Sequence, residues 1–181
     1  MVRSASLFVE SIPNGRVPRK EGEMYERILV PLDGSEVGES ALPFVRDLLS
    51  KLSPEVKVEV TLLQVIRPVY PHVVGGYEVP DIAYTEKELE ETKKKAIDYL
   101  NKAGDTLRSK GATVTARVGV GDASEEIIKA AEEINADLIA MSTHGRSGLS
   151  RWALGSVTDK ILRRGGRVPI LTVRAPGKSE K

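Results

Sequence analysis

The stretch "ILVPLDGSEVGESALPFVRDLL", from Ile28 to Leu49, sets the pattern for the rest of the chain. It begins with a nearly continuous apolar run, Ile28–Leu32, which is typical of a parallel strand covered on both faces. After a polar turn, apolar residues recur at helical spacing from Ala41 onward, and Ser35 is a candidate N-cap for that helix. The stretch therefore predicts a buried strand followed by an amphipathic helix.

The same alternation of short apolar runs and helical patterns continues along the chain. Alternating strands and helices imply right-handed crossovers and a twisted parallel sheet with helices on both faces. No internal repeat is visible, so the sequence predicts a single doubly wound α/β domain with a five-stranded sheet. The other four predicted strands are Val56–Ile66, Ala112–Val118, Ala136–Met141 and Val168–Val173.

Start and stop signals delimit the remaining helices. A capping box at Thr85–Glu88 opens one helix, and Gly111 is its stop signal. Asp122 is the candidate N-cap of the next helix, and the last begins near Ser156 and ends in two arginines. The interval Arg67–Tyr84 contains prolines, glycines and tyrosines, and we expect an irregular loop that is functional or mobile.

Composition and charge exclude several classes of protein. The chain has 181 residues, of which 40% are hydrophobic and 29% charged, as in soluble globular domains. A formal net charge of +1 gives no reason to expect nucleic acid or a membrane surface as a partner. The chain has no cysteine and only two histidines, so thiolate chemistry is excluded and a histidine metal cluster is not expected. No apolar run approaches the length of a membrane span, and we expect a cytoplasmic protein.

The chain divides into an arm, a domain and a tail. Residues 1–24 show no sustained period and are interrupted by proline and glycine. This N-terminal arm is either a mobile tail or an extra strand that clasps a dimer. Residues 25–175 form the predicted domain, and residues 176–181 a short C-terminal tail.

Polar residues follow several of the predicted strands, at the edge of the sheet where ligands bind in open parallel sheets. Asp33 and Ser35 follow the first strand, and either they bind a ligand or they only cap the next helix. The segment Gly119–Ser124 is an incomplete dinucleotide fingerprint, which a tight turn into a capped helix explains better.

The polar loop "STHGRSGLSRWALGS", residues 142–156, follows the fourth strand. Gly145 and Gly148 allow the backbone to turn with its N–H groups pointing inward, and Arg146 can add positive charge. Gly155 and Ser156 then begin a helix whose N-terminus favours an anion. The loop is either a phosphate cradle or a simple connector, and its length favours the cradle.

Taken together, these segments resemble the universal stress protein family over about residues 25–174. The loop follows the family signature G-x2-G-x9-G-[ST], with Ser142 in place of the first glycine. Other segments resemble the family in the same order along the chain, namely "ILVPLDGSEVGESAL", "LLQVI", "VGVGDASEEII" and "VPILTVR".

The resemblance implies an adenine nucleotide alpha hydrolase-like fold with strand order 3-2-1-4-5, which would place Asp33 beside Ser142. It implies binding of ATP or AMP, which Mg²⁺ can accompany, and a homodimer formed by pairing of the last strand, Val168–Arg174. Together with the loop residues, it predicts a nucleotide site made of Pro31, Asp33, Val65, Met141, Ser142, Gly145, Arg146, Gly148, Gly155, Ser156 and Val157.

Three functions from different classes follow from this reading. The leading hypothesis is a nucleotide-binding regulatory module of the stress response. The alternatives are an enzyme that slowly hydrolyses ATP and a nucleotide-free dimer that binds other proteins. The signature loop contains no lysine, and His144 more readily makes a structural hydrogen bond than a proton transfer, so we do not expect dedicated catalysis. Serine at position 142 weakens nucleotide binding if the site needs positive φ or close approach of the ligand there.

Overall fold

The computed structural model describes residues 25–53, 55–67, 72–74, 77–79, 85–143, 155–164 and 168–174. The expected arm at residues 1–24 and the tail at 176–181 lie outside these ranges. In chain order the elements are β1 (Arg27–Pro31), a 3-10 turn η1 (Gly38–Ser40), α1 (Ala41–Leu49), β2 (Glu59–Ile66), β3 (His72–Val74), β4 (Tyr77–Val79), α2 (Glu86–Arg108), β5 (Thr113–Val120), α3 (Ala123–Glu133), β6 (Leu138–Ser142), α4 (Ser156–Arg164) and β7 (Ile170–Val173).

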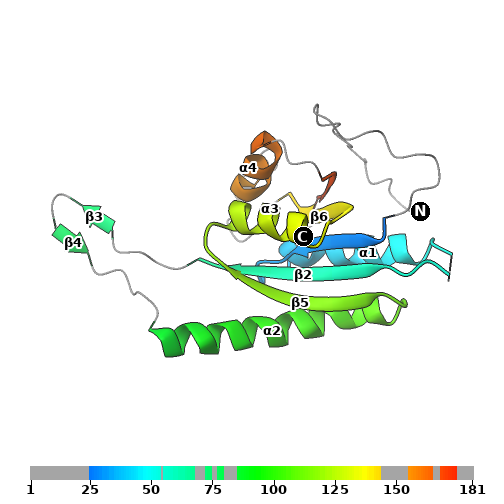
Figure 1. Cartoon of the computed structure of the whole chain (residues 1–181), viewed down its shortest axis with the longest axis horizontal. Helices are drawn as coiled ribbons and strands as arrows, with labels where there is room; N and C mark the ends of the chain where they lie inside the picture. Colours follow the sequence, from blue (N-terminus) through cyan, green and yellow to red (C-terminus); the bar gives the residue numbers. More distant parts are fainter. Residues whose placement is uncertain are drawn as a thin grey trace, which may run out of the picture.

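Five parallel strands form one sheet in the order β5-β2-β1-β6-β7 (Figure 1). This confirms the predicted order 3-2-1-4-5. Ile28 in the central strand pairs with Val60 on one side and with Leu138 on the other. The chain moves outward from β1 to β5 and then returns to β6, so the topological switch point lies between β1 and β6.

The sheet has a hydrophobic core on each face, which is why its central strands are apolar almost throughout. Alternate residues of β1 point to opposite faces, as the pleat requires. Ile28 and Val30 belong to the core under α1 and α2, whereas Leu29 belongs to the core under α3 and α4. In Figure 1, α3 and α4 lie above the sheet and α2 lies below it. The predicted doubly wound arrangement is confirmed.

A buried carboxylate directly precedes β6, inside a segment predicted only as an apolar strand. Asp137 is 6% exposed. Its Oδ2 accepts hydrogen bonds from the backbone N–H groups of Glu26 (3.2 Å) and Arg27 (3.0 Å). Its Oδ1 lies 3.6 Å from the Arg27 guanidinium. Asp137 therefore fastens the beginning of β1 to the beginning of β6.

The structure corrects two sequence predictions about local structure. Part of the interval 67–84, predicted to be irregular, forms an antiparallel β3–β4 hairpin, in which His72 pairs with Val79. Ser35 does not cap α1, because the η1 turn intervenes. The N-cap of α1 is Ser40, whose side chain makes no capping hydrogen bond.

Strand and helix ends otherwise shift by a few residues. The strand predicted from Val56 begins at Glu59, because its neighbour β1 begins at Arg27, which is the partner of Glu59. The capping box of α2 is present as predicted, and Asp122 caps α3. Within the described ranges, no helix combines the length and apolar character needed to cross a membrane.

Candidate functional site

A cavity of about 440 Å³ opens beyond the carboxyl ends of β1, β2 and β6, at the switch point of the sheet. Its volume falls within the range of small-molecule sites, roughly 300–1,000 Å³. All predicted site residues that lie in the described ranges line this cavity. The lining residues are Pro31, Leu32, Asp33, Gly38, Leu63, Val65, Arg67, Ala123, Ile127, Met141, Ser142, Gly155, Ser156, Val157 and Thr158.

Asp33 both lines the cavity and holds its own loop in shape. Its Oδ1 accepts hydrogen bonds from the backbone N–H of Ser35 (3.0 Å) and from the Ser35 hydroxyl (2.6 Å). The Ser35 hydroxyl in turn accepts a bond from the N–H of Gly38 (3.0 Å). Asp33 can therefore both stabilise its own turn and contact a ligand. One carboxylate oxygen makes the hydrogen bonds of the turn, and the residue also lines the cavity.

Gly38 is a cavity residue that sequence reasoning missed. A Cβ at this position would collide with Oδ1 of Asp33 and press against the Ser35 hydroxyl. Any side chain here would thus displace the carboxylate that the loop presents. The close approach of Gly38 to Asp33 therefore requires glycine at this position. The contact exists only in the folded loop, so no local sequence pattern indicates it.

Helix α2 supports the turn that follows Asp33. The Tyr99 hydroxyl donates a hydrogen bond to Oε1 of Glu39 in η1 (2.9 Å). Burial raises the pKa of Tyr99 above its usual value, and the hydrogen bond to Glu39 raises it further. Tyr99 therefore stays protonated and acts as a donor that ties α2 to the turn after Asp33.

Met141 and Ser142 form the wall of the cavity at the end of β6, where they are 5% and 7% exposed. Among the described residues, Asn135 is the one residue other than glycine with a positive φ. The backbone of Ser142 is therefore unstrained, and the concern that serine replaces a glycine with positive φ does not apply. The Ser142 carbonyl accepts a hydrogen bond from the Thr158 hydroxyl (3.3 Å), which joins β6 to α4.

The N-terminus of α4 also lines the cavity, beside the end of β6. Gly155 donates its N–H to the carbonyl of Thr143, which anchors the start of the helix to the end of β6. The first N–H groups of a helix have no carbonyl partner within it, and its dipole places partial positive charge there. Gly155, Ser156 and Val157 thus offer an environment that favours an anion. The predicted site residues Gly145, Arg146 and Gly148 lie outside the described residues.

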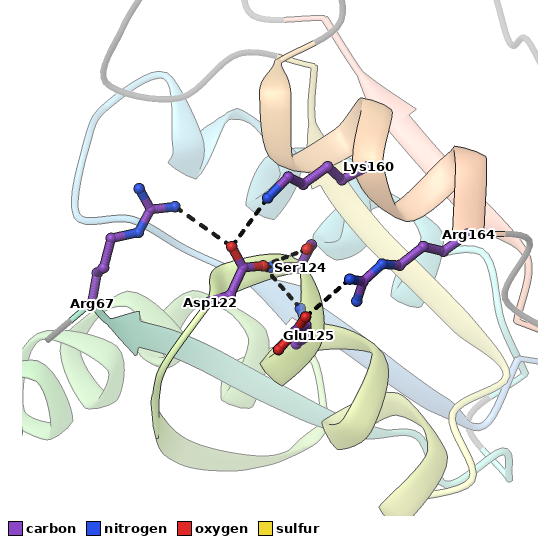
Figure 2. A network of polar contacts seen from close by, with 6 residues as sticks. All are labelled: Arg67, Asp122, Ser124, Glu125, Lys160 and Arg164. Carbon is purple, nitrogen blue, oxygen red and sulfur yellow. Dashed lines mark hydrogen bonds and ion pairs between the residues drawn. The ribbon is translucent and has the colours of Figure 1, made fainter. Parts of the chain in front are cut away.

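A charged network at the edge of the cavity centres on Asp122, as Figure 2 shows. Its Oδ1 caps α3 by accepting bonds from the N–H groups of Ser124 (2.9 Å) and Glu125 (3.3 Å). The hydroxyl of Ser124 donates to the same oxygen and, as the largest cause, holds the pKa of Asp122 well below its usual range. Oδ2 lies 3.2 Å from Nζ of Lys160 and 3.9 Å from a guanidinium nitrogen of Arg67. The Glu125 side chain pairs with Arg164 (2.9 Å) and does not complete a capping box.

Sequence reasoning missed three cavity residues from this side, Arg67, Ala123 and Ile127. A signal for two of them was present. Arg67 directly follows β2, and Ala123 follows the turn after β5, so the rule that strand ends share one edge applies to both. The sequence pattern of the turn before Ala123 predicts the start of a helix and does not by itself indicate a cavity residue.

The described residues contain no group of three or more acidic or histidine side chains arranged to hold a metal ion.

Fold and cavity define an open, doubly wound α/β domain with a cavity at the switch point of its sheet. Residues 24–174 match the universal stress protein family. The universal stress protein MJ0577 of Methanocaldococcus jannaschii is 32% identical over 166 residues, which are 83% of this chain and 96% of that protein. This chain belongs to the universal stress protein family, and it has the adenine nucleotide alpha hydrolase-like fold of that family.

Solved structures agree with this assignment. The structure of MJ0577 aligns with a TM-score of 0.66 at 28% identity and covers 86% of this chain and 100% of that chain. A universal stress protein solved in complex with cAMP aligns with a TM-score of 0.58 at 20% identity, over 84% of this chain and 98% of its own. A family protein from Arabidopsis thaliana with AMP bound aligns with a TM-score of 0.53 at 13% identity, over 86% and 95%. The last two comparisons show similarity of fold.

Proposed function

We propose that this protein binds an adenine nucleotide, ATP or AMP, in the cavity between β1 and β6 and acts as a regulatory module of the stress response. The observation that carries the proposal is the cavity lining, which contains both a carboxylate at the end of β1, Asp33, and the N-terminus of α4. Family membership supports it, as do the solved family members in complex with cAMP and AMP.

In this proposal the two ends of the nucleotide meet different chemistry. Asp33 accepts hydrogen bonds from ribose hydroxyls or the base, and Val65 and Met141 supply apolar surface for the adenine. Phosphates lie near Gly155, Ser156 and Val157, at the N-terminus of α4, where the first N–H groups of a helix have no carbonyl partner within it. Mg²⁺ accompanies ATP through the phosphate oxygens.

The proposal also includes a homodimer and a cytoplasmic location. β7 is the edge strand of the sheet, and its residues are partly buried on both faces. An edge of this kind is a template for pairing with another strand. The edge strand of a second copy of this chain would supply hydrogen-bond partners for its backbone groups. The cytoplasmic location rests on the sequence expectation, and subcellular fractionation tests it.

Replacement of Gly155 by valine should crowd the phosphate end and weaken the binding of ATP and AMP by at least about tenfold. Asp33→Ala should weaken the binding of both ATP and AMP, since it removes the carboxylate that contacts the adenosine part of each nucleotide. Isothermal titration calorimetry with and without Mg²⁺ measures both effects. Thr106→Val, at an exposed position of α2 outside the cavity lining, is the control and should leave affinity unchanged.

The same titrations separate the alternative functions. Stoichiometric binding without phosphate release supports the regulatory module. Sustained phosphate release that Ser156→Ala abolishes would favour an ATP hydrolase. If wild-type protein bound no adenine nucleotide, the nucleotide-free dimer would become the better description.

A further inference from the structure

Two cations approach one carboxylate oxygen at the edge of the cavity. Arg67 comes from the end of β2 and Lys160 from α4, and both point at Oδ2 of Asp122 (Figure 2). The other oxygen of Asp122 is occupied by the cap of α3. The position of this carboxylate is thus set by α3, and the two cations come to it.

The contact between Arg67 and Asp122 is loose enough to be exchanged. The nitrogen and oxygen are 3.9 Å apart, and the Arg67 side chain is 71% exposed. An exposed ion pair at this separation contributes little to stability. Arg67 also lines the cavity together with Gly155 and Ser156, so it borders the space that a ligand would enter.

We infer that Arg67 determines specificity for the phosphate groups of the ligand, and this inference rests on the proposed function. Asp122 is an internal anion that competes with those phosphates for Arg67. A guanidinium binds phosphate oxygens through two parallel hydrogen bonds, which are stronger than a single long contact to a carboxylate. A nucleotide phosphate therefore takes Arg67 from Asp122, whereas a nucleoside without phosphate leaves the pair in place. The ligand class this selects is a nucleoside polyphosphate in preference to a nucleoside.

The inference predicts opposite effects for the two members of the pair. Loss of Arg67 removes a phosphate contact, so affinity should fall with phosphate number and adenosine should be spared. Neutralising Asp122 frees Arg67 and Lys160, so the affinity for ATP should rise. Asparagine caps helices about as well as aspartate, so Asp122→Asn changes the charge and keeps the start of α3.

The experiment measures adenosine, AMP and ATP binding by calorimetry at low ionic strength in the full chain. For Arg67→Ala we expect ATP to bind about tenfold more weakly and adenosine to be unchanged. For Asp122→Asn we expect ATP to bind several-fold more tightly. Arg164→Ala removes an equal charge from a residue paired with Glu125 outside the cavity lining, and it should match the wild type.

Three outcomes would overturn the inference. If Arg67→Ala weakened adenosine and ATP equally, so that the ratio of the two affinities stayed unchanged, Arg67 would only shape the cavity. Weaker ATP binding by Asp122→Asn would mean that Asp122 supports the site and does not compete in it. If the wild-type protein bound none of the three ligands, the proposed function would fail together with the inference, whereas the first two outcomes would refute the inference alone.

Discussion

Ser142 is the residue at which this chain departs from the family signature, and the structure narrows what that departure does. The backbone there is unstrained, so a glycine is not needed for its φ angle. Ser142 is buried and lines the cavity, so in place of glycine it adds a Cβ and a hydroxyl to the cavity wall. The same logic applies at Gly38, where space beside Asp33 requires glycine.

Ser142→Gly should tighten binding of both AMP and ATP several-fold, because it removes a side chain from the cavity wall. Glycine in a strand also costs about 0.5–1 kcal/mol in unfolding free energy, so the variant should be slightly less stable while it binds better. Calorimetry and urea denaturation measure the two quantities.

Ser142→Ala is the matched control for this change, since it keeps the Cβ and removes only the hydroxyl. It should reproduce little of the gain in affinity. Weaker nucleotide binding by Ser142→Gly would contradict the steric account and point to a favourable contact from the serine.

At the scale of elements, the cavity depends on how strand ends and helix starts are joined. Gly155 ties α4 to the end of β6, Tyr99 ties α2 to η1, and Asp122 joins α3 to α4 through Lys160. Asp137 makes a comparable link at the opposite end of the sheet, between β1 and β6. These links bridge elements that are far apart in the sequence.

Asp137→Ala should lower the free energy of unfolding by about 1–3 kcal/mol, because two backbone N–H groups at the start of β1 lose their acceptor. Chemical denaturation measures the change. Asp47→Ala removes an aspartate that is 64% exposed, and it should change stability by less than about 0.5 kcal/mol. Equal effects of the two substitutions would show that the buried acceptor is unimportant.

At the scale of the molecule, the open edge of β7 is the feature that bears on assembly. The carbonyls of Pro169 and Val173 accept bonds from β6, at residues Ile139 and Thr143. Because backbone groups alternate in direction along a strand, the N–H and carbonyl of Ile170 and Thr172 point outward from the sheet. These are the groups that a partner strand would use.

Thr172→Pro should therefore convert the proposed dimer to a monomer without removing a bond between β7 and β6. Proline lacks the outward N–H and is tolerated in edge strands. Sedimentation velocity measures the oligomeric state, with Thr172→Val as a control that keeps the N–H. A dimer that persists in Thr172→Pro would place the interface elsewhere.

The sequence by itself determined the order along the chain of the helices and of the strands in the five-stranded sheet, although not the β3–β4 pair, and it determined the two-sided burial of that sheet. Each of these depends on local periodicity or on a cap, such as the capping box at Thr85, which neighbouring residues specify. Family resemblance added the strand order and the residues expected at the switch point. All of those residues in the described ranges line one cavity.

Only the tertiary structure decided which distant side chains meet. Arg67 and Lys160 converge on Asp122, Gly38 makes room for Asp33, and Asp137 fastens β1 to β6. No local pattern specifies these contacts, because each depends on how the crossovers bring separate elements together. The physical reason is that periodicity in the sequence indicates which face of a helix or strand is buried, whereas tertiary packing decides which element covers that face.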